Sequence, residues 1–434
     1  MKLSKTRLLL SALTALFIGA TRTNADPVLD WNAIAAQTIL APSTRGPAVT
    51  IDFAVVQAAM HDAIQAYDKR FEPYAIHVQN AEGSPAAAVA KVTHDVLVNR
   101  FPAQTATLDG IYNAYLADNG LPLDDPGIVV GAEVAAGIIA LRADDGSFPA
   151  VFPPFLGASL TGVWRPTPSF NPGPPPSFAP MAVPWAAGVT PFVALSPSQF
   201  RAEPPPPLNS AEYARDYNEV KALGSLENSA RTPAQTQLAY FYADNFFMQW
   251  HRVIRSFAEM HIVNDSDRAR FLALAWLAAA DAFITTWDSK IYYCFWRPMT
   301  AINEGDSDGN QKTAGDPNWK PFLNNPNYPE YSSGANGVVG AIFRMFRLYF
   351  GTDKFTFFIT SNHPLAAPNV RVYEHFSDVA QDMVDVRIYH GLHFRSGDEA
   401  GRKVGRQVAK WVFHNALRPL NGQNALEDDD GDDE

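Results

Sequence analysis

The sequence predicts an all-α protein made of two helical halves that are joined by an extended, proline-rich arm. Apolar residues recur at helical spacing from about 30 to 142 and again from 210 to 416, and no alternating strand pattern competes with them. Residues 149–207 hold 17 of the 34 prolines, and such a density excludes helix from that stretch. With 434 residues, 47% of them hydrophobic, the chain has ample material for a buried core.

Residues 1–25 have the pattern of a secretory signal peptide. A basic start precedes a mostly apolar run over 8–20, and Thr23 and Ala25 are small residues before a plausible cleavage point. Thirteen residues are too few for a membrane span, which needs about 20. The alternative is a buried or amphipathic first helix. We expect no later apolar stretch to reach the length of a span, and therefore a soluble product that is secreted or periplasmic.

The first helical half is predicted over 26–148. Apolar residues form a broad stripe over 51–60, and further helices are expected over 85–99, 105–116 and 125–141. Gly120 and Pro122 separate the last two.

The proline-rich region over 149–207 has two interpretations. One is a disordered linker, and the other is an extended arm that packs across the helices. Aromatic residues interleave with the prolines, which is unlike a disordered composition and favours the arm. These aromatics are Phe152, Phe155, Trp164, Phe170, Phe178, Trp185 and Phe192.

The second helical half is predicted over 208–420. It contains an alanine-rich stretch over 273–280, a polar loop over 304–327, and helices over 334–350, 377–389 and 399–414. Residues 421–434 form an acidic tail, with seven acids in the last eight positions, that we expect to be disordered. Metal binding by that tail is a weaker alternative.

The charge and cysteine content exclude two classes of protein. A net charge of -11 argues against a general nucleic-acid binder, which needs a basic face. A single cysteine excludes a disulfide framework and a cysteine-based zinc site. An anion site remains allowed, because a few cations can converge locally.

Three segments concentrate residue types that bind anions. In the first, Lys290 and Arg297 flank aromatic residues and lie two helical turns apart, so one continuous helix would bring both heads to one point. In the second, Ser333 and Gly334 open an apolar helix, whose first N–H groups favour a phosphate-like anion. Taken singly, these segments also fit surface charges and an ordinary helix cap.

The third segment, residues 387–398, holds two histidines, two arginines and an aspartate. His393 lies six positions after Arg387 and five before Asp398, a carboxylate that we expect to orient its ring. A structural histidine is the alternative.

In this order and spacing, the three segments resemble the type 2 phosphatidic acid phosphatase superfamily, and within it the secreted vanadium-dependent haloperoxidases. Shorter matches extend the resemblance over nearly all of the chain that follows residue 25. They are residues 26–32, 60–63, 164–168 and 231–236.

The resemblance implies a helical bundle around a vanadate or phosphate pocket. Lys290, Arg297 and Arg387 would neutralise the oxyanion, and Ser333 and the Gly334 N–H would hydrogen-bond to it. His393 would bind vanadium, or act as the nucleophile of a phosphatase. The implied cofactor is vanadate for a haloperoxidase and none for a phosphatase.

The chain departs from the family pattern at three places. Ser332-Ser333-Gly334-Ala335 replaces Pro-Ser-Gly-His, so Ala335 stands where the family has its acid–base histidine. Val386 replaces the serine before the arginine, and Asp398 comes one position later than usual. His390 and Glu330 are candidate substitutes for the missing acid–base group, although a surface or structural role is the simpler interpretation of each.

These observations lead to three functional hypotheses. The first is a vanadate-dependent haloperoxidase that uses hydrogen peroxide to oxidise a halide, with an organic acceptor as final substrate. The second is an acid phosphatase that cleaves phosphate esters through phospho-His393. The third is a relative that kept the fold and lost turnover. None of them involves nucleic acid or stable membrane insertion.

Overall fold

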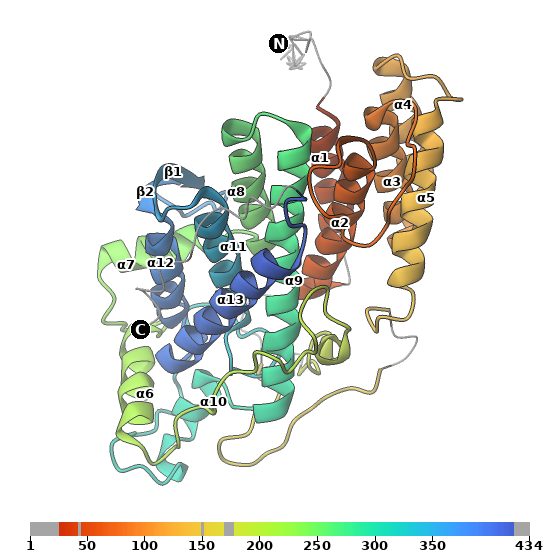
Figure 1. The fold of residues 1–434 in the computed structure, drawn as a ribbon. Helices are drawn as coiled ribbons and strands as arrows, with labels where there is room; N and C mark the ends of the chain where they lie inside the picture. Colours follow the sequence, from red (N-terminus) through yellow and green to blue (C-terminus); the bar gives the residue numbers. More distant parts are fainter. Residues whose placement is uncertain (1–25, 42–44, 149–151, 169–177, 421–434) are drawn as a thin grey trace, which may run out of the picture.

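We analysed the protein as a computed structural model, which describes residues 26–41, 45–148, 152–168 and 178–420. The predicted signal peptide and the acidic tail lie outside these residues. Within them, the chain is mostly helical, with thirteen α-helices and one β-hairpin, as the predicted all-α class requires (Figure 1).

Two groups of helices flank a long central helix, α9 (Asp265–Tyr293) (Figure 1). The N-terminal group is α1 (Pro27–Leu40), α2 (Val49–Asp68), α3 (Pro85–Arg100), α4 (Thr105–Asp118) and α5 (Pro126–Leu141). The second group is α6 (Ala211–Leu223), α7 (Pro233–Phe241), α8 (Phe246–His261), α10 (Pro298–Asn303), α11 (Gly334–Phe350), α12 (Phe376–Tyr389) and α13 (Arg395–Asn415). Short 3₁₀ turns lie at Gly46–Ala48, Pro102–Gln104, Pro184–Gly188 and Gly305–Ser307.

Helix starts follow local chemistry. Asp26, Ser84 and Asp125 each cap a helix whose first residue is proline, and each side chain accepts a hydrogen bond from a first-turn N–H. Thr232 and Gln235 form a reciprocal capping box at the start of α7. These signals explain why the helices predicted over 85–99 and 125–141 begin within a residue of the observed positions. The helix predicted over 105–116 also begins where expected, although its N-cap, Gln104, makes no side-chain capping bond.

The absence of strands was predicted wrongly. Lys354–Thr360 (β1) pairs antiparallel with Val370–His375 (β2). The pattern is weak because Phe357, Phe358 and Ile359 are consecutive apolar residues, which hides the alternation of buried and exposed positions.

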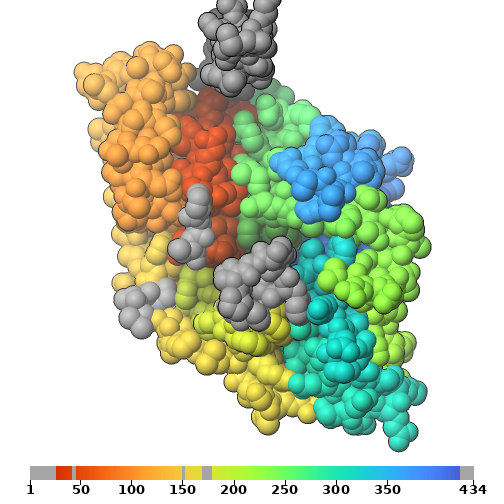
Figure 2. Space-filling view, turned by 180° about the vertical axis from the view of Figure 1, so that it is seen from behind, coloured from red at the N-terminus to blue at the C-terminus, as the bar shows by residue number. Residues whose placement is uncertain are grey.

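The described parts of the arm pack against the second half of α9. The Trp164 N–H donates to the carbonyl of Cys294 at 2.7 Å, and Trp164 is 1% exposed. Asp281 of α9 accepts three backbone N–H groups from residues 192–194. Figure 2 shows the arm's described residues, in yellow, between the N-terminal helices and the residues near 300. These contacts favour a packed arm over a disordered linker.

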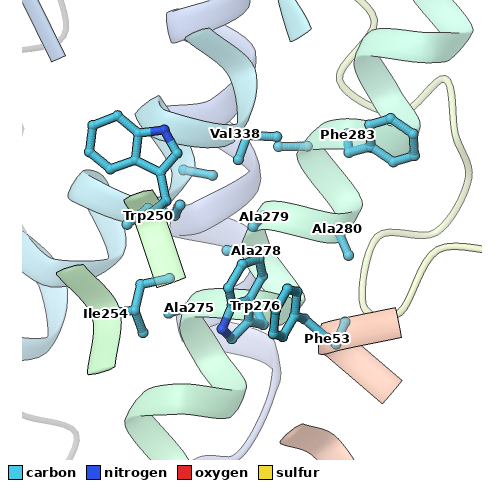
Figure 3. Close-up of a cluster of buried hydrophobic side chains, with 14 of the residues drawn as sticks. Phe53, Trp250, Ile254, Ala275, Trp276, Ala278, Ala279, Ala280, Phe283 and Val338 are labelled. Atoms are coloured by element: carbon cyan, nitrogen blue, oxygen red, sulfur yellow. The ribbon is translucent and has the colours of Figure 1, made fainter. Parts of the chain in front are cut away.

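The core centres on α9, whose alanines admit large neighbours. The rings of Phe53 and Trp276 stack with centroids 4.0 Å apart, and Figure 3 places alanines of α9 between Trp250 and Phe53. By length and composition α9 is long enough to cross a membrane, so the expectation that no such stretch follows residue 25 was wrong. Its apolar window is nevertheless wholly buried in protein, as in the core helix of a globular fold.

Candidate oxyanion site

Lys290 lies in the last turn of α9, and Arg297 lies beyond the end of that helix. Cys294 adopts a left-handed backbone conformation (φ 45°) that ends α9, and the chain is extended at Arg297 before α10 begins. The expectation of one continuous helix carrying both cations was therefore wrong. Both side chains are still fully buried, and the charge of Arg297 reinforces burial in holding the pKa of Lys290 well below its usual value.

Arg387 and His393 come from the connection between α12 and α13. Arg387 lies in the last turn of α12, and Gly391 (φ 76°) then turns the chain toward His393. A Cβ atom at Gly391 would lie 2.4 Å from the Gly224 carbonyl oxygen, so the turn requires glycine. Burial, reinforced by Arg297, lowers the pKa of His393 well below its usual value, so the ring is neutral near pH 7.

The serine–glycine turn lies beside these residues because α11 and α13 pass very close to each other. Ser333 is the N-cap of α11, and its N–H donates to the Gly397 carbonyl at 2.9 Å. A Cβ atom at Gly401 would lie 2.3 Å from the Ser333 carbonyl oxygen, so only glycine permits this approach. The crossing fixes the turn relative to the segment that carries His393.

The two nitrogens of His393 have different partners. Nη1 of Arg297 lies 3.1 Å from Nε2, and an arginine can only donate, so Nε2 accepts. The ring proton is then on Nδ1, which donates to Oε1 of Glu330 at 2.8 Å. Glu330 and Arg297 together select the tautomer whose Nε2 lone pair faces Arg297.

Asp398, which was expected to orient the His393 ring, has other partners. It accepts from Nδ2 of Asn336 at 2.7 Å and from the Ser333 hydroxyl. Burial nevertheless raises the pKa of Asp398 well above its usual value. The expectation was wrong because Glu330, 63 positions before His393, occupies the Nδ1 side of the ring.

The three cations of the site are held by neutral groups. Nζ of Lys290 donates to the carbonyls of residues 329 and 330, both at 2.8 Å, and Arg297 donates to the carbonyls of residues 328 and 392 at 2.9 and 2.8 Å. Nη1 of Arg387 lies 3.4 Å from Nδ1 of His390. None of the three forms an ion pair with any carboxylate of the described chain. Burial lowers the pKa of each, that of Arg297 to about 10.

Several buried donors here have no hydrogen-bond partner within the described residues. They are Nη2 of Arg297, Nε of Arg387 and Oγ of Ser332. Leaving such donors unpaired in the interior is costly, and a tetrahedral oxyanion would satisfy them. These donors and the surplus of positive charge fit vanadate or phosphate.

A cavity of about 420 Å³ adjoins the site at Arg387. Arg387, Gly334 and Ala335 line it, and most of its remaining wall is apolar or aromatic. The other lining residues are Gly46, Pro47, Phe246, Phe247, Phe283, Trp287, Leu323, Asn324, Pro326, Tyr328, Val338 and Leu392. No histidine, aspartate or glutamate is among the described residues that line the cavity, so Ala335 leaves its wall without a general acid of those types.

His390 lies behind Arg387 rather than on the cavity wall. Its Nε2 is 2.8 Å from the Ala239 carbonyl, its Nδ1 faces Arg387, and it is completely buried. Burial lowers its pKa to about 3. With both nitrogens engaged and the ring neutral, the geometry favours a role in holding Arg387 over proton transfer to a substrate.

The structure thus brings Lys290, Arg297, Arg387 and His393 together beside the Ser333–Gly334 turn. Sequence reasoning missed the Glu330–His393 contact and the parts played by Asn336 and Ser332. Glu330 had been named, for its closeness to the turn, as a candidate substitute for the acid–base group; it instead contacts Nδ1 of His393 and is not among the described cavity-lining residues. A polar residue at position 336 gave no signal of its contact with Asp398.

The comparisons with known proteins concern the fold and the part of the chain that holds this site. Residues 270–422, which include every predicted site residue, match a family model described as "VCPO second helical-bundle domain". Together with the proteins described next, this match supports the vanadium haloperoxidase/type 2 phosphatidic acid phosphatase superfamily for this chain.

The chain is similar to vanadium chloroperoxidase of Curvularia inaequalis, with 26% identity over 170 residues. The match covers 34% of this chain and only 27% of that relative. A bacterial vanadium-dependent iodoperoxidase has a similar structure, with a TM-score of 0.73 and 23% identity over 91% of this chain and 96% of its own. A holo-type bacterial vanadium-dependent chloroperoxidase has a TM-score of 0.69 and 17% identity, covering 87% of this chain and 94% of its own.

Proposed function

We propose that this protein is a vanadate-dependent haloperoxidase-like enzyme that uses hydrogen peroxide to oxidise a halide. The observation that carries the proposal is a neutral His393 whose Nε2 accepts from Arg297, close to Lys290 and Arg387, three cations that lack carboxylate partners among the described residues. The matched family model and the vanadium-dependent relatives support the same reading.

The residues have distinct parts in this proposal. Lys290, Arg297 and Arg387 neutralise the oxyanion, and Nε2 of His393 holds it. Glu330 keeps the His393 proton on Nδ1. Bound vanadate would supply activation of hydrogen peroxide. Neutral donors to the oxyanion would be the Gly334 N–H, at the start of α11, and the Ser332 hydroxyl, which has no partner within the described residues. The Ser333 hydroxyl is already hydrogen-bonded to Asp398.

The cavity gives the site its access. Its mostly aromatic and apolar wall suits a small organic acceptor, and Arg387 lies on that wall. Ala335 at the wall supplies no proton carrier, and loss of a general acid costs about 10²–10⁴-fold in rate. We therefore expect slow turnover. We further propose that residues 1–25 direct the protein out of the cytoplasm.

The second candidate is an acid phosphatase that works through phospho-His393, because the same tautomer and cations suit attack on a phosphate ester. A leaving group that needs a proton would find none at position 335. A third candidate is a catalytically impaired relative that binds an oxyanion without turnover.

The deciding experiment combines binding and activity. Orthovanadate binding is measured by calorimetry. We expect vanadate to bind the parent protein and to bind His393→Ala much more weakly. The affinity of His77→Ala, a control at an exposed position, should equal that of the parent. Bromide-dependent oxidation of a phenolic dye, with and without vanadate, is measured beside hydrolysis of p-nitrophenyl phosphate. Hydrolysis without dye oxidation supports the phosphatase, and vanadate binding with neither activity supports the impaired relative. Unchanged binding by His393→Ala would end the proposed role of this residue.

A further inference from the structure

On the side of α11 and α13 away from the oxyanion cavity's lining residues, the two helices form a basic groove. Two adjoining hollows of about 330 and 370 Å³ share Arg344, Arg402 and Arg406. The groove exists because α11 and α13 cross closely, with a Cβ atom at Gly405 placed only 2.2 Å from the Gly337 carbonyl oxygen. The larger side chains of the two helices therefore diverge on either side of a narrow floor.

Positive charge dominates this basic groove. Its cations are Arg344, Arg347, Arg402, Lys403, Arg406 and Lys410, and its described acids are Asp353 and Glu399. Asp353 already accepts hydrogen bonds from the Ser377 N–H and hydroxyl. The groove therefore carries a net positive charge, although the whole chain has a net charge of -11.

The cations of α13 follow a regular spacing. Arg402, Arg406 and Lys410 lie four residues apart, so they line one face of the helix over about 12 Å. All three are half-buried. A row of this length matches an extended anionic segment of a few residues better than a single small ion.

The chain itself carries a segment of matching charge. Residues 427–434 read Glu-Asp-Asp-Asp-Gly-Asp-Asp-Glu, with seven acids in eight positions, and the uncharged residues 421–426 join them to the described fold. Leu420, the last described residue, is fixed by a hydrogen bond from its N–H to the Arg70 carbonyl at 2.9 Å.

The segment is long enough to reach the groove. Lys410 and Leu420 are separated by five helical residues and five further residues, so they lie at most about 25 Å apart. The fourteen residues after Leu420 span up to about 46 Å when extended. A tether of this length also gives the segment an effective concentration in the millimolar range at the groove.

We propose that residues 427–434 dock in the basic groove as an intramolecular electrostatic clasp across α11 and α13. The proposal goes beyond the proposed function and does not depend on it, because it concerns a different surface. Single exposed ion pairs are weak and are screened by salt, so the clasp requires several pairs at once and weakens as ionic strength rises.

The test measures binding of a fluorescently labelled peptide of residues 427–434 by anisotropy at low salt. The acceptors are the parent chain and a full-length tail-neutral variant, in which the seven acids are replaced by their amides. We expect the peptide to bind the tail-neutral variant at least tenfold more tightly than the parent, because the parent's own segment competes. A peptide with the same amide replacements serves as the probe control.

Groove variants then locate the contact. Arg402→Gln/Arg406→Gln in the tail-neutral background is expected to weaken peptide binding at least tenfold, whereas Arg215→Gln/Lys312→Gln, two exposed cations outside the groove, is expected to leave it unchanged. Circular dichroism checks folding, and Lys403→Gln/Lys410→Gln replaces the first pair if it does not fold. Equal binding to parent and tail-neutral chains, no binding to either, or equal weakening by both pairs of variants overturns the proposal.

Discussion

The two helical halves treat buried positive charge in opposite ways. In the N-terminal half, Asp52 pairs with Arg45 at 2.7 Å and with Arg100 at 2.6 Å, and Arg142 pairs with Asp145 at 2.7 Å. In the C-terminal half, Lys290 and Arg297 are fully buried but have only carbonyl or imidazole partners. A buried charge that the fold itself does not neutralise marks the place where an outside anion is needed.

The halves differ less in how they use buried carboxylates to hold loops. Asp62 of α2 accepts the N–H groups of residues 74–76, and Asp281 of α9 accepts those of residues 192–194. Burial raises the pKa of both carboxyl groups to about 6, although the backbone hydrogen bonds that they accept act in the opposite direction. Loop anchoring is therefore common to both halves, whereas, within the described parts of the chain, the three site cations without a carboxylate partner lie in the C-terminal half.

The largest expected effect tests the balanced half. Asp52→Asn leaves the buried Arg100 without its counter-charge, so the free energy of unfolding should fall by about 3–5 kcal/mol in urea titrations. Asp68→Asn, an exposed carboxylate on the same helix, should change it by less than about 0.5 kcal/mol. Similar losses for the two variants would remove the distinction between the halves.

The next effect tests the unbalanced half. Arg387→Met removes a half-buried cation that has no carboxylate partner among the described residues, so the unfolding free energy of the ligand-free protein should change by less than about 1 kcal/mol. Sulfate affinity, measured by calorimetry, should fall about tenfold to a hundredfold, because a charge-assisted hydrogen bond is worth about 1.5–3 kcal/mol. A large loss of stability with unchanged sulfate affinity would show that Arg387 is structural.

The third effect depends on pH and on Glu330. Burial raises the pKa of Glu330 to about 7, so the group is neutral at pH 6 and anionic at pH 8. Its negative charge opposes a bound anion, and at about 8 Å with an effective dielectric near 20 the penalty is about 2 kcal/mol. Sulfate, which keeps its charge over this range, should therefore bind up to about thirtyfold more weakly at pH 8 than at pH 6.

Glu330→Gln is the matched control, since a glutamine oxygen still accepts from Nδ1 of His393 but does not ionise. Its sulfate affinity should depend less on pH. Lys290, whose pKa lies well below its usual value, and Asp398, whose pKa lies well above, also face the site, and any slope that remains belongs to them. An unchanged pH profile in Glu330→Gln would contradict the assignment to Glu330.

The sequence predicted the helices and the segments of the site better than the contacts within it. Helix 334–350 was predicted to the residue, because Ser333 is a strong cap and the apolar stripe is clear. The hairpin escaped because consecutive apolar residues concealed its alternation. Its pairing also depends on a connection of nine residues whose path no local pattern gives.

Contacts between distant residues were the least accessible. Glu330 meets His393 only because Gly401 lets α13 pass against the Ser333 carbonyl, and no local pattern reveals such a crossing. The choice of Asp398 as the orienting group followed spacing along the chain, and tertiary packing overrode it. Lys290 and Arg297 were paired for the wrong reason, since Cys294 breaks the helix between them.

The smallest expected effect concerns Ala335, which lies on the cavity wall in the first turn of α11. Ala335→His adds a proton carrier to the cavity wall. The described residues that line this cavity include no histidine, aspartate or glutamate, and His393 is not among them. An imidazole with a pKa near its ordinary value of about 6.5 is suited to exchange protons at neutral pH. We expect halide oxidation in the presence of vanadate to rise roughly tenfold, with vanadate affinity changed much less. Ala335→Gln, of similar size but unable to titrate, should not increase the rate. A well-folded Ala335→His variant that binds vanadate but is no faster than the parent would mean that proton transfer does not limit halide oxidation at this site. The cations of the C-terminal half would then serve anion binding and would not by themselves support turnover.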